Sequence, residues 1–248
     1  KFKKIDIITF TNVFAHIDNF EMLIVNLKKI INKNTIIVIE NHYLGSILKK
    51  KQFDTFYHEH PRTYSLNSFL HIANLLDMNV VNYSMPKRYG GNVRVFLKKE
   101  IRKKQKTFAL IKKEKKFKLK FKEMQKFINF WKIKKYKILK ELFKKYGRLN
   151  GKAFPGRAAI LIKSLGINEK IINAVYEKPA SKKIGYYVPG TKIPIKSDKE
   201  LFKKIKKQKF IINFAWHIDK EIKKYLNHNG FKGKVINILD RNDLSWKK

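Results

Sequence analysis

The sequence predicts a mixed α/β protein in which two α/β parts flank a lysine-rich helical segment. Short, continuously apolar runs alternate with segments of helical periodicity, a pattern typical of parallel sheets covered on both faces. This alternation occurs twice, before and after a stretch in which lysines surround a single apolar stripe. Such a stripe indicates one long amphipathic helix or a helix pair. We therefore predict three parts, residues 1–100, 101–147 and 148–248.

The first part contains two apolar runs, residues 5–10 and 35–40, that we interpret as buried strands. Between them, residues 20–31 carry apolar side chains at three- and four-residue spacing, which predicts a helix. The polar residues that follow end that helix. The same criteria predict a further helix, with Ser65 as its N-cap, and two more strands: residues 66–76, 79–83 and 92–97.

The lysine-rich part carries its apolar residues at helical spacing. A basic amphipathic helix of this kind can lie on an anionic membrane surface. A connector that packs its stripe on the protein's own domains explains the pattern more simply, and we prefer it. No apolar run reaches the roughly 18 residues that a membrane span requires, because lysines interrupt each one. The stripe comprises Phe117, Phe121, Met124, Ile128, Trp131, Ile138 and Leu142.

The third part repeats the alternation of strands and helices. A turn-rich stretch precedes an apolar segment that predicts a buried helix, residues 157–165. Residues 173–177 predict a short strand that ends in an acid. The remaining elements are expected to follow as helix, strand, helix and strand: residues 200–206, 210–215, 220–226 and 235–239.

The net charge of +39, from 58 basic and 19 acidic residues, is of the kind found in nucleic-acid-binding proteins. Nearly all the basic residues are lysines, however, and they occur with abundant Ile and Asn, which share A/T-rich codons. Arginine forks and exposed stacking aromatics are expected of a specific nucleic-acid reader. We therefore expect a cationic surface without a specific nucleic-acid partner. The chain has no cysteine, which excludes disulfides and thiolate metal sites within it.

The stretch FDTFYHEHPRTYSL concentrates polar, titratable side chains at Tyr57, His58, Glu59 and His60. It lacks the HExxH spacing that places two histidines on one helix face, and two ligands alone do not make a zinc site. We expect no metal here. Histidines beside a carboxylate and a phenol fit general acid/base chemistry. The alternative is a polar loop whose side chains cap neighbouring groups.

This stretch resembles the corresponding segment of sugar C-methyltransferases, S-adenosylmethionine-dependent enzymes that methylate C-3 of a nucleotide-linked 4-keto-deoxysugar. The resemblance extends along nearly the whole chain, with its blocks in the same order. The further blocks are IDIITFTNVFAHIDN, GGNVRVFLKK, FPGRAAILIKSLGI, GYYVPGTKIPI and FIINFAWHIDKEI.

The resemblance implies an N-terminal zinc domain, a Rossmann-like donor domain and a C-terminal Rossmann-like domain. The chain resembles the donor domain only from about its fourth strand onward, so residues 1–100 are expected to form the C-terminal half of that domain. We expect most of the S-adenosylmethionine site, and any zinc, to lie upstream of Lys1 in a longer protein.

By the same resemblance, His60 is the expected base that removes the proton from C-3, with Glu59 and Tyr57 orienting the sugar or stabilising the enolate oxygen. His16 follows the first strand, and functional sites of open α/β sheets gather at the carboxyl ends of strands. We therefore expect His16 in the same site. Three further residues are weaker candidates for lining it: Asn12, Asn92 and Arg94.

In the third part, the resemblance implies contacts with the nucleotide-sugar. Gly156 and Arg157 stand at the turn that opens a helix, where backbone N–H groups can bind phosphate oxygens. Glu177 ends a strand at the place where Rossmann-like folds put an acid near a ribose. Tyr187, in the YVPGT turn, and Trp216, after a strand, are further candidates for substrate binding. The alternative for these residues is a structural role.

We interpret the sequence as part of a cytoplasmic, S-adenosylmethionine-dependent C-methyltransferase whose partner is a nucleotide-linked keto-deoxysugar. Two alternatives stay open. One is a nucleotide-sugar-binding module without catalysis, and the other is a basic nucleic-acid-binding protein that uses the lysine-rich helices. The sequence predicts neither the oligomeric state nor the identity of the sugar and nucleotide.

Overall fold

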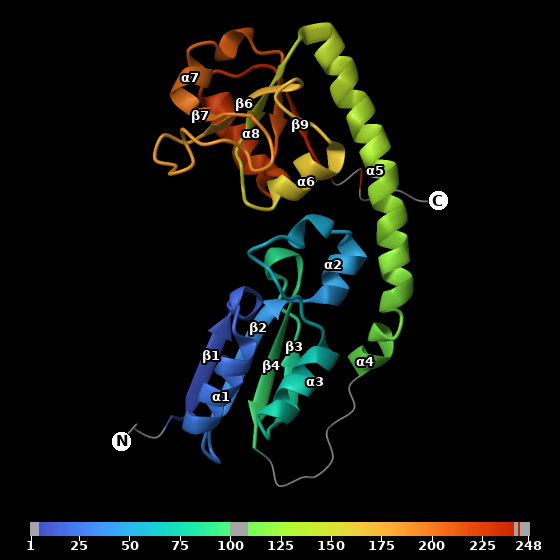
Figure 1. Ribbon diagram of the computed structural model, residues 1–248, viewed down its shortest axis with the longest axis vertical. Coiled ribbons are helices and arrows are strands. Elements are labelled where there is room, and N and C mark those ends of the chain that lie inside the picture. The colour runs from blue at the N-terminus through green and yellow to red at the C-terminus, as the bar shows by residue number, and fades with distance from the viewer. Residues whose placement is uncertain (1–4, 100–108, 241–242, 244–248) are drawn as a thin grey trace. The chain divides into compact units, whose positions relative to one another are not determined.

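Two units make up the chain, Lys1–Gln125 and Lys126–Lys248, and the boundary between them falls within the long helix α5 (Phe117–Tyr146). The computed structural model describes residues 5–99, 109–240 and 243. Each unit is mixed α/β and has its own sheet (Figure 1). The boundaries expected at residues 100 and 147 stay predictions, and the start of the expected connector, residues 101–108, lies outside the described residues.

The sheet of the first unit has four strands in the order β1-β2-β4-β3. β1 (Ile7–Thr11) and β2 (Ile36–His42) are parallel. β4 (Asn92–Lys98) lies antiparallel to both β2 and β3 (Asn79–Ser84). The carboxyl ends of β1 and β2 and the start of β4 therefore share one edge of the sheet, where open α/β sheets place their functional groups.

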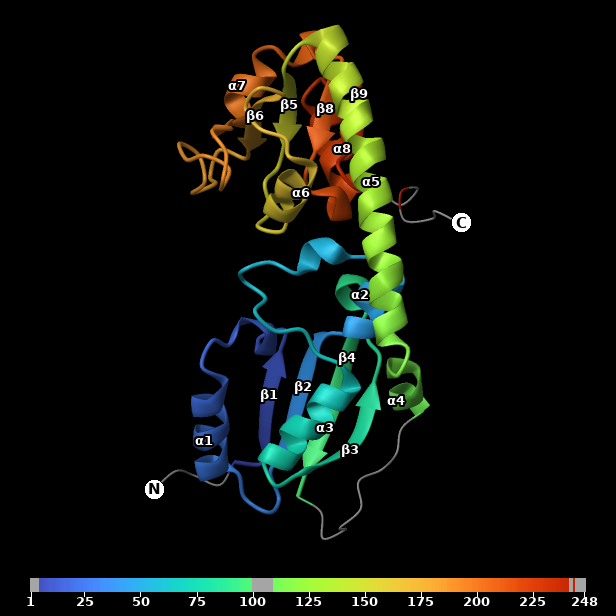
Figure 2. The same cartoon turned by 45° about the vertical axis from the view of Figure 1, so that its right-hand side comes forward.

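Two helices cover one face of this sheet, α1 (Phe20–Ile30) and α3 (Leu66–Leu75), as Figure 2 shows. Alternate apolar side chains of the strands pack against them, among them the fully buried Ile39. The N-cap predicted at Ser65 is confirmed, since its hydroxyl accepts a hydrogen bond from the Ser68 N–H at 3.1 Å.

Helix α4 (Ala109–Glu114) supports the start of α3. The Glu114 carboxylate accepts hydrogen bonds from the Leu66 and Asn67 N–H groups at 2.7 and 3.0 Å, and from the Tyr43 hydroxyl at 3.0 Å. A carboxylate in this place satisfies donors that have no partner within the helix. Burial, together with the Glu114 charge, raises the pKa of the Tyr43 hydroxyl well above its usual value, so the hydroxyl remains a donor.

The sheet of the second unit has five parallel strands in the order β7-β6-β5-β8-β9. The first strand in sequence, β5, is central, and the strand order reverses between it and β8. This arrangement is compatible with a Rossmann-like fold. The strands are β5 (Leu149–Lys152), β6 (Ile172–Glu177), β7 (Ile195–Ser197), β8 (Phe210–Asn213) and β9 (Lys234–Asn237).

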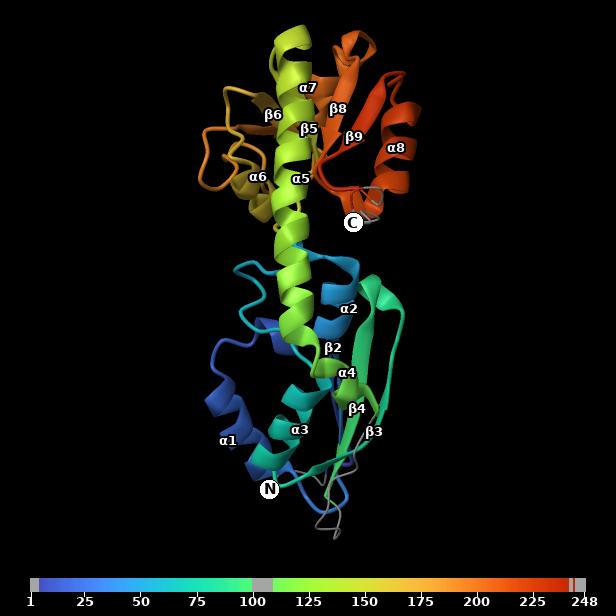
Figure 3. The same ribbon diagram turned by 90° about the vertical axis from the view of Figure 1, so that its right-hand side faces the viewer.

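The helices of the second unit are α6 (Ala158–Leu165), α7 (Asp198–Phe202), α8 (Asp219–His228) and residues 126–146 of α5. Buried side chains of α7 and α8 pack in one cluster with alternate residues of β6 and β8. Figure 3 views this sheet with α5 in front. None of the helices in the described part of the chain combines the length and apolar character that crossing a bilayer requires.

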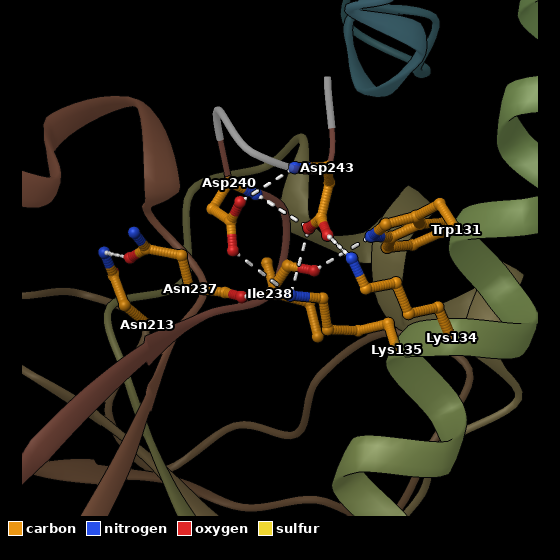
Figure 4. Close-up of polar contacts among 8 residues, drawn as sticks. All are labelled: Trp131, Lys134, Lys135, Asn213, Asn237, Ile238, Asp240 and Asp243. Carbon is orange, nitrogen blue, oxygen red and sulfur yellow. Dashed lines mark hydrogen bonds and ion pairs between the residues drawn. The ribbon is translucent and has the colours of Figure 1, made fainter. Parts of the chain in front are cut away.

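Helix α5 is joined to the end of β9 by polar groups that are buried (Figure 4). The Trp131 indole donates to the Ile238 carbonyl at 3.1 Å, and the Lys135 ammonium donates to the Asn237 carbonyl at 3.0 Å. The same ammonium lies 3.0 Å from a carboxylate oxygen of Asp243, and both side chains are almost fully buried. Removing either charge leaves the other buried with a more distant partner, which is Lys134 at 3.9 Å for Asp243 and Asp240 at 3.6 Å for Lys135.

We predict that Lys135→Met lowers the free energy of unfolding of the second unit by about 3–5 kcal/mol, because Asp243 keeps its charge in a buried place. Lys134→Met is the matched control on the same helix, since Lys134 is about half exposed and 3.9 Å from Asp243. It should cost less than about 1 kcal/mol. Urea unfolding followed by tryptophan fluorescence measures both, because all three tryptophans belong to this unit. Equal effects of the two substitutions would contradict the prediction.

Candidate active site

The structure brings together His16 and His60, which come from segments that follow two neighbouring parallel strands. His16 ends the short 3-10 helix η1 (Phe14–His16) after β1, and His60 lies in the segment between α2 (Leu44–Lys50) and α3. Their ring centroids are 4.7 Å apart in an edge-to-face arrangement. Two imidazoles in contact at the carboxyl edge of a sheet are suited to moving protons in a shared site.

The hydrogen bonds of His60 define its neutral form. Its Nδ1 lies 3.2 Å from the Thr55 carbonyl oxygen, which can only accept, so Nδ1 carries the hydrogen. The lone pair of the neutral ring is therefore on Nε2. The backbone is held as well, because the His60 N–H donates to the Tyr57 carbonyl at 2.8 Å. This is the arrangement that a general base requires: one nitrogen oriented by a fixed acceptor and the other basic.

The other polar groups of the motif lie around His60. The Tyr57 ring centroid is 4.7 Å from that of His60, and its hydroxyl donates to Glu59 at 3.1 Å. His58 is 76% exposed; its Nε2 is 3.8 Å from Glu59, and its ring centroid is 5.6 Å from that of Tyr57. Among the residues that the structure describes, no group of three or more His, Asp or Glu side chains could hold a metal ion.

A buried carboxylate organises the edge of the sheet beside these segments. Glu40, near the end of β2, is 2% exposed and accepts hydrogen bonds from the Asn92 amide at 2.9 Å and from the Arg94 Nε at 2.8 Å. The Asn92 amide also donates to the Asn12 side chain at 3.0 Å. These contacts join the three candidate lining residues into one network around Glu40.

The network also sets the charge state of Glu40. Burial by itself would raise the pKa of this carboxyl, but the hydrogen bonds from Asn92 and Arg94 and the Arg94 charge outweigh it and hold the pKa below its usual value. Asn92 and Arg94 thus stabilise the ionised form of Glu40 in its buried place. Glu40 was not among the site residues predicted from the sequence, although a charged side chain at the end of an apolar run was the available signal.

The predicted residues of the second unit lie at or after the carboxyl ends of its strands, with one exception. Gly156 and Arg157 precede α6, and the Arg157 guanidinium lies over the Trp216 ring, 5.6 Å from its centroid. Glu177 accepts from the Phe154 N–H at 2.6 Å and so closes the loop after β5. Tyr187 is the exception: it is exposed and pairs with Pro194 before β7.

A buried ion pair near the same edge was not anticipated. The Lys152 ammonium at the end of β5 lies 2.8 Å from a carboxylate oxygen of Asp198, and both side chains are inaccessible to water. The Tyr225 hydroxyl donates to the same oxygen at 2.9 Å. Burial and the contact with Asp198 raise the pKa of Tyr225 to about 12. Residues 151–156 were expected to form a turn-rich stretch, whereas Gly151 and Lys152 belong to β5.

Comparison with known proteins assigns the family. A family model described as "C-methyltransferase C-terminal domain" matches residues 87–238, which is more than half of the chain. The C-methyltransferase NovU of Streptomyces niveus is 30% identical over 83 residues, which is 34% of this chain and 20% of that protein. The aligned part thus spans about a fifth of the relative's length.

The chain belongs to the C-methyltransferase C-terminal domain family. The resemblance to C-methyltransferases that the sequence blocks indicated is therefore confirmed. The roles of individual residues in the site stay predictions.

We predict that Glu40→Gln lowers the free energy of unfolding of the first unit by about 1.5–3 kcal/mol at pH 7, because charged hydrogen bonds to Asn92 and Arg94 are lost. The folded-state pKa of Glu40 is depressed, so its contribution is present above the usual pKa of a glutamate, about 4.3, and is lost as the pH falls through the lower folded value. The difference in the free energy of unfolding between wild type and Glu40→Gln should therefore shrink as the pH falls.

Urea unfolding followed by the NMR signals of β2 amides measures this difference at several pH values. The control is Asp77→Asn, which breaks a surface ion pair with Lys28 at 3.1 Å and keeps a residue that tolerates the positive φ of 55°. It should cost less than about 1 kcal/mol. A Glu40→Gln effect that persists undiminished in acid would contradict the charge assignment.

Proposed function

We propose that the chain supplies the base of a C-methyltransferase that acts on a nucleotide-linked keto-deoxysugar. The observation that carries the proposal is the bond between His60 Nδ1 and the Thr55 carbonyl at 3.2 Å, which leaves Nε2 as the basic nitrogen of a ring that contacts His16 and Tyr57. Methylation of a carbon next to a ketone needs such a base. Membership of the C-methyltransferase family and the relative NovU support this reaction class.

In this proposal His60 Nε2 takes the proton from the carbon next to the ketone. The electron pair of the broken C–H bond moves to form the enolate, whose charge is on the former carbonyl oxygen. The imidazolium that forms keeps its Nδ1 hydrogen bond to Thr55. A donor close to His60 can stabilise the enolate oxygen, and His16 is the proposed donor. The Tyr57 hydroxyl gives its one hydrogen to Glu59, so Tyr57 is proposed to orient the sugar. Glu59, which accepts from Tyr57, orients that hydroxyl.

S-adenosylmethionine is the methyl donor that this class of enzyme implies. The described residues do not make up a site for it. The sequence has no pair of glycines separated by one residue, as a glycine-rich donor loop requires. Glu40, the carboxylate near the end of β2, is 2% exposed and bonded to Asn92 and Arg94, so its burial restricts the access of a ribose hydroxyl. In this proposal the residues of the chain therefore account for the formation of the enolate and not for the transfer of the methyl group.

The second unit is proposed to contact the nucleotide part of the substrate. Its parallel sheet reverses strand order between β5 and β8, and such reversals are common ligand sites. Gly156 and Arg157, at the start of α6, are the proposed phosphate contacts, and Trp216 beside Arg157 offers an aromatic surface. Glu177 is bonded to the Phe154 N–H, so we assign it to shaping this loop. Tyr187 is proposed only as a surface contact.

Hydrogen exchange at the substrate carbon tests the proposal without the methyl donor. The chain is incubated in D₂O with a nucleotide-linked 4-keto-deoxysugar, and deuterium next to the ketone is followed by NMR. His60→Ala should slow the exchange by about 10²- to 10⁴-fold, because no general base remains, while the sugar still binds.

His58→Ala is the matched control for the exchange experiment. It removes the same side chain two residues away, at an exposed position, and should leave exchange unchanged. Saturation-transfer NMR shows whether the substrate binds in each case. Binding without exchange in the wild-type chain would favour a non-catalytic nucleotide-sugar-binding module, and exchange that survives in His60→Ala would refute the base assignment.

A further inference from the structure

We infer that Arg62 is a positioning residue that holds the His16 segment against His60. The inference rests on the proposed function for its effect on exchange, but its structural part stands on contacts alone. Arg62 lies two residues after His60. Its guanidinium donates to the carbonyl of Ile17 through Nη1 and to the carbonyl of Asp18 through Nη2, the latter at 3.2 Å. These are the two residues that directly follow His16.

A second contact holds the other side of His16. The Tyr64 hydroxyl donates to the Phe14 carbonyl at 3.1 Å, and the Tyr64 side chain is buried. The Phe14 and Tyr64 rings also meet edge to face, with centroids 5.8 Å apart. Arg62 and Tyr64 thus bind the backbone on the two sides of His16.

The arginine side chain is suited to this role for two reasons. Its planar guanidinium presents several donors in a fixed geometry and can bind two carbonyls at once, which a lysine ammonium on its flexible stem does less well. The guanidinium also lies 5.6 Å from the centroid of the Phe20 ring, at the start of α1. Arg62 therefore adds side-chain contacts to the connection between η1 and α1, beyond the backbone bond from the His16 N–H to the Val13 carbonyl at 2.9 Å.

The expected consequence of losing this contact is a displaced His16 with an otherwise intact fold. Tyr64, Phe14 and the helix α3 keep the segment attached at its buried side. A displacement of the order of 1 Å in a catalytic group can cost about 100-fold in rate. Because Arg62 acts through His16 and is not itself proposed to touch the substrate, kcat should fall while KM changes little.

The test compares Arg62→Met and Arg62→Lys with wild type by two measurements. The first is the nuclear Overhauser effect between the His16 and His60 ring protons in the full chain. The second is kcat and KM for solvent exchange into the keto-sugar. Arg62→Met should weaken or abolish the Overhauser effect and lower kcat by about 10- to 100-fold, with KM within about 2-fold. Arg62→Lys should give intermediate values, because one of the two carbonyl contacts can be kept.

Lys29→Met is the control: it removes an exposed cation of α1 in the same unit, which contacts Asn26, and should change neither measurement. An Overhauser effect at wild-type strength in Arg62→Met overturns the inference, and so does an unchanged kcat after the effect is lost. If the wild-type chain shows no exchange, the proposed function fails, whereas the Overhauser comparison still decides whether Arg62 positions His16. Should Arg62→Met not fold, Arg62→Lys provides the same comparison.

Discussion

The parallel pairing of β1 with β2 is the constraint on which the candidate site depends. It places Thr11 opposite Glu40, and the Asn12 N–H continues the ladder to the Glu40 carbonyl at 2.8 Å. The segments that carry His16 and His60 therefore leave the sheet at the same edge, although the two residues are far apart in sequence. Side-chain contacts then hold the two segments together. Arg62 and Tyr64 donate hydrogen bonds to carbonyls beside His16, and the His16 and His60 rings are in contact.

The antiparallel strand β4 adds a second condition. Its register sets Arg94 opposite Glu40 and Asn92 opposite His42, so both side chains can reach the buried carboxylate. A buried charge of this kind is tolerated only when it is paired and hydrogen-bonded. The Glu40 network therefore ties the strands at the point where the site segments begin, and the carboxylate is committed to structure and not to a ligand.

Much of the fold could be predicted from the sequence, because its strands are apolar runs and its larger helices show clear periodicity. The exceptions have physical reasons. Helix α2 has only seven residues, too few for a periodic signal. Strand β5 reads Leu-Asn-Gly-Lys, which looks like a turn, yet all four residues are buried because it is the central strand. Within the site, the proximity of His16 to His60 followed from strand topology, whereas the roles of Thr55, Glu40 and Arg62 depend on tertiary contacts that no local pattern reveals.

The central claim is that neutral His60 carries its hydrogen on Nδ1 and offers Nε2 as the base. Long-range ¹H–¹⁵N correlation NMR of the histidine rings distinguishes the two tautomers directly. The bond to the Thr55 carbonyl predicts that the neutral ring of His60 has its hydrogen on Nδ1 and none on Nε2. A neutral His60 with its hydrogen on Nε2 would contradict the account, since the nitrogen proposed to take the substrate proton would already hold one.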